Sequence, residues 1–595
     1  MCGITAYCGR SNALPFLLRG LEKLEYRGYD SSGISLLDNS KIMTEKKQGR
    51  LKVLEDVVAP LQLYGTSGIA HTRWATHGEP SDVNAHPHNN PENTISIVHN
   101  GIIENADELK ADLKAQGYVF KSQTDTEVIV ALLDYYYTGN PLQALQQTIA
   151  RLKGSYALAC LFADHSDTVY TARLNSPLIL GQGPNRTMAA SDIPALLGNV
   201  DHFYLLDDHQ LACMTPDHIT IYNENLEETQ AQPVNFNIDA EVISKGGFPT
   251  FMEKEIHEQP FALQQTLGEN IQDNKVVLEA LSDIKEVSGV YLFACGTAYH
   301  ACLVASSYFE QLTDIPCVTK TASEFRYSAL HLPENSLAIF VSQSGETADT
   351  LAACKMAQQQ GALTLAITNV VSSSLARICD RVLYTKAGIE IAVASTKAYT
   401  TQVLLLLLVA LHFSKAEHPD LLEDIQKLPH LVDLTLNGKE DFEDCVRFFE
   451  KATSAFYIGR QLDYTSAMEG ALKIKEIAYI HAEAFAAGEL KHGPIALVDE
   501  TTPVIALATQ KEVLEKTLSN VEETISRKAH AILLTESDHI ESKEQLHVIR
   551  LPKTHPLLYP IIAIVPLQIL ACRLATVRHH DVDKPRNLAK SVTVE

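Results

Sequence analysis

The amino-acid sequence predicts an α+β domain followed by two doubly wound α/β domains. Residues 1–235 contain short alternating or apolar runs separated by turn residues, with helical patterns such as 126–137 between them. The pattern breaks over 230–260, around a Lys-Gly-Gly-Phe-Pro segment, which indicates a linker between domains. After this break an apolar strand, a glycine turn and a helix follow one another repeatedly, which is typical of a doubly wound sheet.

The rhythm of strand, turn and helix occurs twice in the second part of the chain. One apolar run ends before Gly296 and a similar run ends at Gly459, and a helical pattern follows each. We interpret them as two copies of one domain, although their residues agree only weakly. The predicted organisation is a domain at 1–235, a linker with a lead-in helix at 236–280, domains at 281–435 and 436–580, and a tail at 581–595.

The composition is that of a soluble globular protein with several domains. The chain has 595 residues, 46% of them hydrophobic and 21% charged, and is too long for a single core. The formal net charge of -24 opposes nucleic-acid binding, so any phosphate site has to be built locally from backbone N–H groups and a few cations.

Cysteine usage and apolar runs bear on the compartment. The 11 cysteines form no disulfide pattern and the N-terminus lacks a signal segment, which predicts a reduced, cytoplasmic protein. The longest uninterrupted apolar run, 403–411, is shorter than the ~20 residues of a membrane span. We therefore expect a buried helix there and no membrane partner.

The second residue of the chain, Cys2, is a candidate nucleophile. Removal of Met1 would leave a cysteine that carries its own base, because a free α-amino group titrates near ~8 and can accept the thiol proton. The thiolate is the form that attacks. Taken alone, Cys2 is equally well explained as the residue that happens to follow the initiator methionine.

Several blocks downstream give Cys2 a context. The blocks 25–33, 71–78, 99–105 and 124–127, together with Cys2, resemble the N-terminal-nucleophile glutaminase family. The resemblance implies αββα layers and hydrolysis of glutamine, with a fixed cation for the substrate carboxylate and a fixed anion for its ammonium. It assigns the oxyanion donors to Asn100 and Gly101, the glutamine pocket to Arg73, Thr76, His77 and Asp125, and an ammonia gate to Trp74.

Other interpretations of this segment stay open at the level of sequence. Arg73 and Asp125 could belong to surface ion pairs, and Trp74 could be an ordinary core anchor. The histidines between 71 and 99 could hold a metal, but no C-x-x-C or H-E-x-x-H spacing occurs, and hydrogen bonding around a glutamine pocket explains them better. We expect no metal, nucleotide or pyridoxal cofactor.

The strongest chemical motif of the second part is the Ser-Gln-Ser-Gly-Glu-Thr segment at 342–347. It follows an apolar strand and precedes a helical pattern, so N–H groups and hydroxyls there could hold a phosphate, although such residues are also common helix caps. The segment resembles the phosphate loop of the sugar isomerase domain family. The resemblance implies a sugar-phosphate site made of Thr297, Ser342, Gln343, Ser344, Thr347, Val393, Ala394 and Ser395.

A charged motif follows in the second copy. Glu469, Lys473 and Glu476 fall at i, i+4 and i+7 and share one helical face. A solvated stripe of ion pairs is the ordinary explanation of this spacing. Conversion of a ketose to an aldose, however, needs a carboxylate base, and opening of the sugar ring needs a proton shuttle. The family resemblance gives these roles to Glu476 and His492, with Lys473 assisting.

The tail at 581–595 resembles that of the isomerising glutamine:fructose-6-phosphate amidotransferases, so the resemblance covers essentially the whole chain. In that family the lysine at the place of Lys590 forms a Schiff base with the open-chain ketose, whereas a mobile charged tail is the alternative. The implied reaction converts L-glutamine and D-fructose 6-phosphate to L-glutamate and D-glucosamine 6-phosphate, in a homodimer. Ala298 departs from the family, which usually has serine there.

Two other functions compete with this one. An amidotransferase acting on phosphoribosyl pyrophosphate would need an acidic pyrophosphate loop, and the sequence has none. A non-catalytic sugar-phosphate sensor would be expected to have lost Cys2, Glu476 or Lys590, and all three are present.

Overall fold

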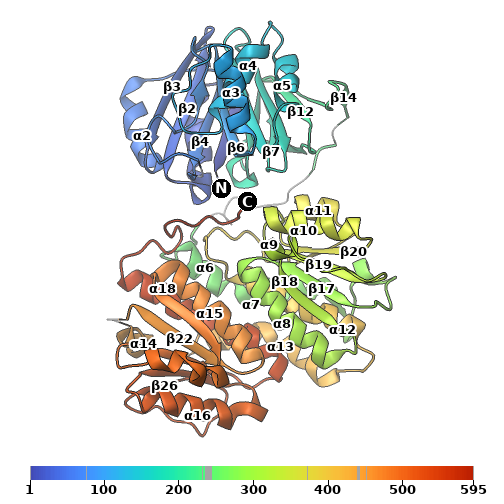
Figure 1. The fold of residues 1–595 in the computed structure, drawn as a ribbon, viewed down its shortest axis with the longest axis vertical. Helices are drawn as coiled ribbons and strands as arrows, with labels where there is room; N and C mark the ends of the chain where they lie inside the picture. Colours follow the sequence, from blue (N-terminus) through green and yellow to red (C-terminus); the bar gives the residue numbers. More distant parts are fainter. Residues whose placement is uncertain are drawn as a thin grey trace. The chain divides into compact units, whose positions relative to one another are not determined.

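The computed structural model describes residues 2–75, 77–230, 232–234, 244–371, 373–438, 442–449 and 452–593, apart from the side chain of Glu269. Thr76 and residues 235–243, which include the start of the linker predicted at 236–280, lie outside these residues. The contacts divide the chain into two compact units, which are Met1–Ser244 with Ala589–Glu595, and Lys245–Leu588 (Figure 1).

The first unit contains two antiparallel sheets that face each other. The first sheet has the strand order β11 (His202–Leu205), β9 (Ile179–Gly183), β10 (Arg186–Ala190), β1 (Gly3–Gly9), β4 (Ser67–Arg73), β2 (Ser31–Asp38), β3 (Lys41–Gln48). The second has the order β14 (Glu228–Thr229), β13 (Ile219–Tyr222), β12 (Leu211–Met214), β8 (Val169–Leu174), β7 (Gly154–Phe162), β6 (Ile95–Ile103), β5 (His88–Asn89). Buried side chains from both sheets, such as Ile4 and Val98, form one apolar cluster, so the sheets pack face to face.

Helices cover the outer faces of the two sheets. On the first sheet, α1 (Leu14–Leu24) lies over β1 and β4, and α2 (Leu51–Val58) lies beside β2 and β3. A separate apolar cluster joins the second sheet to three helices, α3 (Ala106–Ala115), α4 (Glu127–Tyr136) and α5 (Pro141–Ile149). The predicted αββα layers are therefore confirmed (Figure 1).

The second unit contains two parallel five-stranded sheets with the same topology. The first half has the order β18 (Cys317–Thr321), β17 (Val290–Ala294), β19 (Leu337–Ser342), β20 (Leu363–Thr368), β21 (Arg381–Tyr384). The second half has the order β23 (His481–Ala486), β22 (Ser454–Gly459), β24 (Val504–Leu507), β25 (Ala531–Thr535), β26 (Leu546–Arg550). In each half the second strand along the chain is the edge strand beside the first. The prediction of two doubly wound copies is confirmed.

Helices surround both sheets of the second unit. A lead-in pair precedes the first half: α6 (Phe251–His257) and α7 (Gln259–Asn270), followed by the short hairpin β15 (Ile271–Gln272) and β16 (Lys275–Val276). The first half carries α8 (Gly296–Leu312), α9 (Ala322–Phe325), α10 (Ala348–Gln359), α11 (Ser374–Ile378), α12 (Lys397–Phe413) and α13 (Pro419–Leu436). The second half carries α14 (Phe442–Phe448), α15 (Leu462–Ala478), α16 (Leu514–Ile525), α17 (Tyr559–Ile562) and α18 (Ile564–Val577).

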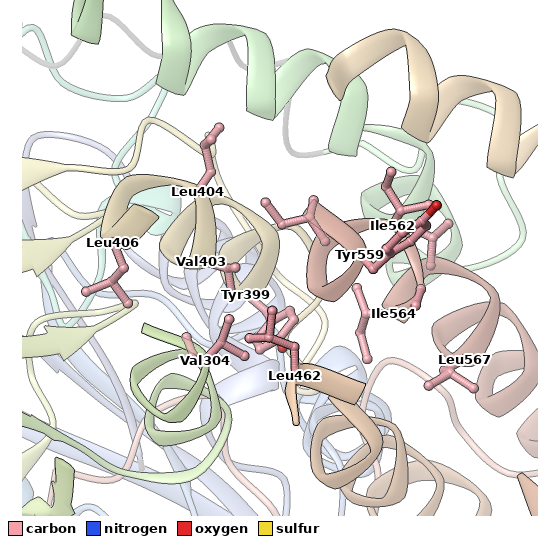
Figure 2. Packing of buried hydrophobic residues seen from close by; sticks show 14 of the residues in the cluster. Val304, Tyr399, Val403, Leu404, Leu406, Leu462, Tyr559, Ile562, Ile564 and Leu567 are labelled. Carbon is pink, nitrogen blue, oxygen red and sulfur yellow. The ribbon is translucent and has the colours of Figure 1, made fainter. Parts of the chain in front are cut away.

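The two halves share one large apolar cluster, and each also has a smaller cluster of its own. Figure 2 shows Val304 of α8 and Val403 of α12 in the same cluster as Leu462 of α15 and Leu567 of α18. Helix α12 contains the predicted buried apolar run and is buried on nearly all sides. Because this core runs through both halves, they form one unit.

A longer apolar segment than 403–411 exists near the C-terminus. Pro556–Val577 spans 22 residues with a mean hydropathy of 1.9, and by length and composition it is long enough to cross a membrane. Polar residues such as Gln568 interrupt its apolar sequence, so a search for uninterrupted runs passes over it. Since 89% of it is buried inside the protein, we interpret it as a core element of the second unit.

Candidate active sites

The first candidate site lies where the start of β1 meets the ends of β4 and β6. The Cys2 sulfur accepts a hydrogen bond from the backbone N–H of Trp74 at 3.3 Å. The Cys2 carbonyl oxygen accepts hydrogen bonds from Asn100 Nδ2 at 2.9 Å and from Arg27 Nε at 3.2 Å. The structure therefore brings together three residues that the sequence analysis assigned to the glutaminase site, namely Cys2 as nucleophile, Asn100 as oxyanion donor and Trp74 as ammonia gate.

Asn100 and Gly101 are held in a geometry that few other residues could adopt. The Oδ1 atom of Asn100 accepts a hydrogen bond from His71 Nε2 at 3.0 Å, which directs the amide NH2 group toward Cys2. Gly101 has a φ angle of +135°, and a Cβ atom there would lie 2.0 Å from the Ser155 carbonyl oxygen. A side chain at 101 would therefore displace the strand that carries Asn100.

Arg73 and Asp125 are buried rather than paired at the surface. Arg73 is 3% exposed; its Nη2 atom donates to the carbonyls of His77 and Gly78, and its Nη1 atom has no hydrogen-bond partner among the described residues. Asp125 is 6% exposed and accepts a hydrogen bond from the N–H of Ile103 at 2.8 Å. A buried guanidinium with an unused donor fits a carboxylate ligand, because such donors are normally satisfied.

Four histidines form a buried group beside this site: His71, His86, His88 and His99. Two of their rings stack with centroids 4.2 Å apart, and two others bond to the hydroxyls of Thr124 and Thr126 at 3.1 and 2.8 Å. Burial lowers the pKa of all four, to about 3 for His71. They are therefore neutral at pH 7, and they tie the segment that carries Asp125 to the second sheet.

The environment of Cys2 works against ionisation of its thiol. Burial raises the pKa of Cys2, and the hydrogen bond from the Trp74 backbone and the charges of Arg73 and Arg27 only partly oppose this shift. A base is therefore needed to take the proton when the thiol attacks. The α-amino group of the mature cysteine is the base that the sequence analysis assigned to this task.

The second candidate site is a buried cluster of charges on α15. Lys473 Nζ lies 3.2 Å from Glu469 Oε1 and 2.7 Å from Glu476 Oε2, and both Glu469 and Lys473 are fully buried. Thr297 of α8 joins them, because it accepts from Lys473 at 3.0 Å and donates to Glu469 at 3.0 Å. The charged face predicted from spacing is therefore not a solvated stripe, and it links the two halves.

Burial and charge act in opposite directions on this cluster. Burial alone would lower the pKa of Lys473, but the charges of Glu469 and Glu476 outweigh it and raise that pKa. Burial alone would raise the pKa of Glu469, but Lys473 and His300 outweigh it and lower that pKa. Both groups are therefore charged at neutral pH, and each depends on the other.

The loop at 342–347 follows β19, which pairs with β17, the strand that comes just before Thr297 in the chain. Ser342 Oγ accepts a hydrogen bond from Gly345 N at 3.0 Å and lies 2.9 Å from Thr347 Oγ1. Gly345 has a φ angle of +66°, and a Cβ atom there would lie 2.1 Å from Ser373 Oγ. The loop thus closes tightly at the carboxyl ends of two neighbouring strands, where ligands of doubly wound sheets bind.

Comparison with known proteins relates both sites to one family. The family model of a glutamine amidotransferase domain matches residues 71–198, and that of the SIS domain matches residues 283–412 and 448–578. Glutamine--fructose-6-phosphate aminotransferase [isomerizing] of Caldanaerobacter subterraneus subsp. tengcongensis is 47% identical over 608 residues, which cover 100% of both chains. The proteins of the same name from Clostridium perfringens and Methanosarcina acetivorans are 46% and 44% identical, again with 100% of both chains covered.

The chain belongs to the glutamine–fructose-6-phosphate aminotransferase (isomerizing) family.

A solved structure agrees with this family assignment. The C-terminal domain of glucosamine-fructose-6-phosphate aminotransferase from Francisella tularensis aligns with a TM-score of 0.54 and 36% identity, covering 57% of this chain and 99% of that one. The family resemblance predicted from the sequence is therefore confirmed, as is the class of enzyme, a glutamine amidotransferase with sugar isomerase domains.

The contacts described above do not include the side chains of some of the family's predicted site residues. His492 is exposed at the end of the short helix η6 (Ala487–His492), and no hydrogen bond or ion pair among the described residues joins it to Lys473 or Glu476. Lys590 is grouped with the first unit, whereas Lys473 and Glu476 belong to the second. His77 is exposed, and Thr76 lies outside the described residues. The roles of these residues stay predictions.

The sequence analysis did not predict that His300 belongs to the charged cluster. His300 Nδ1 lies 2.7 Å from Glu469 Oε2, on the side of the carboxylate away from Lys473. His300 comes three residues after Thr297, so both project from the same face of α8. This spacing was the available signal, but the contact with Glu469 spans 169 residues and no local pattern reports it.

Proposed function

We propose that this chain converts D-fructose 6-phosphate and L-glutamine to D-glucosamine 6-phosphate and L-glutamate. The observation that carries the proposal is that one chain holds both a Cys2–Asn100 site of the amidotransferase type and a buried Lys473 cluster beside a phosphate-type loop. Full-length relatives that bear the name of this activity support it.

The first unit releases ammonia from glutamine. The Cys2 sulfur attacks the side-chain carboxamide carbon while the mature α-amino group takes the thiol proton, and ammonia leaves as a thioester forms. Asn100 Nδ2 and the N–H of Gly101 hold the oxyanion, and a donor of this kind is worth ~10²–10³ in rate. Arg73 binds the substrate carboxylate and Asp125 its ammonium, with Thr76 and His77 lining the pocket. Water then releases glutamate.

Ammonia passes to the sugar site inside the protein, with Trp74 as its gate. A closed route matters because ammonia in water at pH 7 is mostly ammonium, which is not a nucleophile. The hydrogen bond from the backbone N–H of Trp74 to the Cys2 sulfur supports this role, since residue 74 is then a neighbour of the sulfur at which ammonia would form.

The second unit accepts the nitrogen. Ser342, Gln343, Ser344 and Thr347 hold the phosphate, and Thr297, Val393, Ala394 and Ser395 line the sugar. His492 opens the ring, Lys590 forms an imine at C2 with loss of water, and ammonia displaces the lysine. Glu476 then moves a proton from C1 to C2, which leaves an aldehyde at C1 and an amine at C2.

The remaining parts of the proposal concern assembly and organisation. We propose a cytoplasmic homodimer in which the exposed His492 reaches the sugar site of the other chain. The domain boundaries at 235, 281, 436 and 581 stay part of the proposal. No nucleic acid or membrane takes part.

Cysteine substitution separates the two activities. The variant Cys2→Ala should form no glucosamine 6-phosphate from glutamine, but should still form it from fructose 6-phosphate and ammonium. Cys8→Ala is the matched control, because burial raises the pKa of the Cys8 thiol to about 12 and should keep it unreactive. A Cys2→Ala protein that still uses glutamine, or that is inactive with ammonium while remaining folded, contradicts the proposal.

A further inference from the structure

The two halves of the second unit place different groups at the same position of one fold. In each half the first and third strands along the chain are neighbours, and the strand order changes direction there. Ligands of doubly wound sheets bind at this position, beyond the carboxyl ends of the strands. The first half has the loop 342–347 there, and the second half has the loop that follows β24, beginning at Ala508.

A residue with a positive φ angle begins the first helix of each half. Gly296 and Gln461, at the start of the first helix of each half, both have left-handed φ angles, of +57° and +54°. The residues two positions later are Ala298 in the first half and Asp463 in the second. Ala298 and Asp463 therefore occupy equivalent places at the start of α8 and α15.

Strand pairing matches the loops in the same way. Leu292 lies four positions before Gly296 and pairs with Ile339. Tyr457 lies four positions before Gln461 and pairs with Ile505. Four residues further along the chain, 343–344 in the first half correspond to Thr509 and Gln510 in the second. The loop proposed to bind the phosphate thus has a counterpart at 509–510.

In the second half a carboxylate of the chain itself fills this counterpart. Asp463 Oδ2 accepts hydrogen bonds from the N–H groups of Thr509 at 2.8 Å and Gln510 at 3.3 Å, and Asp463 Oδ1 accepts from the Thr509 hydroxyl at 2.5 Å. Asp463 is 2% exposed, and no salt bridge reaches it among the described residues. Burial raises its pKa to about 6, against which the three hydrogen bonds act.

A buried carboxylate without a cation is costly, and its donors are the kind that bind a phosphate. Backbone N–H groups and a hydroxyl at the beginning of a helix form an anion site in many proteins. Asp463 uses these donors from within the protein. In the first half the equivalent residue is Ala298, which has no side-chain oxygen, so no carboxylate stands at that position beside the loop 342–347.

We propose that the carboxylate of Asp463 is an internal substitute for a phosphate. In the second half it occupies the position at which the first half binds the phosphate of its sugar. The residue pair Ala298 and Asp463 then decides which half accepts a sugar phosphate. Each chain should bind one hexose phosphate, although its fold has two equivalent positions. This inference rests on the proposed function of the loop 342–347.

The second consequence concerns α15. Because Asp463 fastens the start of this helix to the loop after β24, it also fixes the helix that carries Glu469, Lys473 and Glu476. The second half then positions these three groups, whereas the first half binds the phosphate.

Transfer of the carboxylate to the first half tests the inference. Ala298→Asp and Ala298→Asn, in the full-length chain, differ by a charge at nearly the same volume. With calorimetric titration of fructose 6-phosphate, we expect one site per wild-type chain and at least ~100-fold weaker binding by Ala298→Asp, because like charges meet. Ala298→Asn should stay within ~10-fold of wild type, since it adds no charge.

Removal of the carboxylate from the second half gives an independent readout. In Asp463→Ala, formate or inorganic phosphate should raise the thermal midpoint in a saturable manner, because the anion replaces the missing group. The control variant is Asp499→Ala, which removes an exposed carboxylate of the same half. Neither anion should raise the thermal midpoint of this variant or of the wild type in a saturable manner. Far-ultraviolet circular dichroism confirms that each variant is folded.

The outcomes separate this inference from the proposed function. If the wild type binds one hexose phosphate and a folded Ala298→Asp binds it equally well, only the inference fails. If the wild type binds two hexose phosphates per chain, the inference is also wrong. The same holds if neither formate nor inorganic phosphate raises the thermal midpoint of folded Asp463→Ala. If the wild type binds no hexose phosphate, the inference and the proposed function fail together.

Discussion

The two units solve the problem of buried polar groups in different ways. The site of the first unit is supported by histidines that burial keeps neutral, with the pKa of His71 lowered to about 3. The site of the second unit is supported by charges, because Lys473 and Glu469 are both fully buried and both ionised. A neutral imidazole can be buried when its hydrogen bonds are met, whereas a buried charge depends on its partners.

Because of this difference, different changes should destabilise the two units. The first unit should be sensitive to acid, because its neutral histidines gain protons when the chain unfolds. The second should be sensitive to loss of a single charged partner, because the remaining buried charge is then only partly compensated. The following changes test that contrast, in order of decreasing effect.

The largest expected effect is on the chemistry of the sugar site. Glu476→Gln removes the carboxylate that we propose moves the proton between C1 and C2, so formation of glucosamine 6-phosphate should fall by ~10²–10⁴. Hydrolysis of glutamine should remain. The matched control is Glu483→Gln, an exposed glutamate on the neighbouring strand β23. Equal losses in the two variants, measured as product formation, would show that Glu476 has no special role.

The next effect is on stability. Glu469→Gln leaves Lys473 with one of its two carboxylate partners, and it should lower the free energy of unfolding of the second unit by about 3 kcal/mol. The double variant Glu469→Gln with Lys473→Met should recover much of this loss, because the fully buried ammonium is then gone and only the partly exposed Glu476 loses its partner. Urea unfolding monitored by circular dichroism measures both. If the double variant is no more stable than the single one, the buried charge is not the cause.

Between pH ~6.5 and ~4.5 the acid sensitivity of the first unit should be slightly smaller per group, at up to about 2.7 kcal/mol. The pKa of His71 falls from about 6.5 in the unfolded chain to about 3 in the folded one, so its contribution is complete above about 6.5 and lost as the pH falls toward 3. Each neutral histidine contributes up to about 1.4 kcal/mol per pH unit in that window.

Fluorescence can follow this acid effect in the first unit alone, because Trp74 is the single tryptophan of the sequence. The variant His88→Gln keeps a polar group beside Thr124 but cannot titrate, so it should lose less stability than the wild type between pH ~6.5 and ~4.5. An unchanged pH profile in the variant would contradict the explanation.

The smallest effect is expected for a charge pair at the surface. Glu423 and Lys427 lie 2.6 Å apart on α13, but their side chains are 69% and 51% exposed. Glu423→Gln should leave the urea midpoint unchanged within error, since exposed pairs contribute little. A loss similar to that of Glu469→Gln would mean that burial does not explain the second unit's sensitivity.

The sequence predicted much of this fold and part of the two sites. The spacing of Glu469, Lys473 and Glu476 placed them on one helical face, because neighbours on a helix are three or four residues apart. It could not show that the face is buried, since burial comes from α8 in the other half. His300 and Asp463 were missed for the same reason, because their contacts join segments far apart in the chain.

The residues of the glutaminase site were predicted from a different kind of signal. Nothing local to Cys2 distinguishes it, and its role was inferred from blocks that resemble a known family. The unused Nη1 donor of the buried Arg73 could only come from coordinates. Helix α12 was recognised from its apolar run, whereas Pro556–Val577 was overlooked because Gln568 and Arg573 interrupt its pattern.

Transfer of labelled nitrogen tests most directly the claim that one chain joins these two unlike sites. The wild type would receive fructose 6-phosphate, glutamine labelled with ¹⁵N in its amide, and an excess of unlabelled ammonium. We predict that the glucosamine 6-phosphate formed carries ¹⁵N, as measured by mass spectrometry. Product with unlabelled nitrogen, or glutamate release without any amino sugar, would contradict the account.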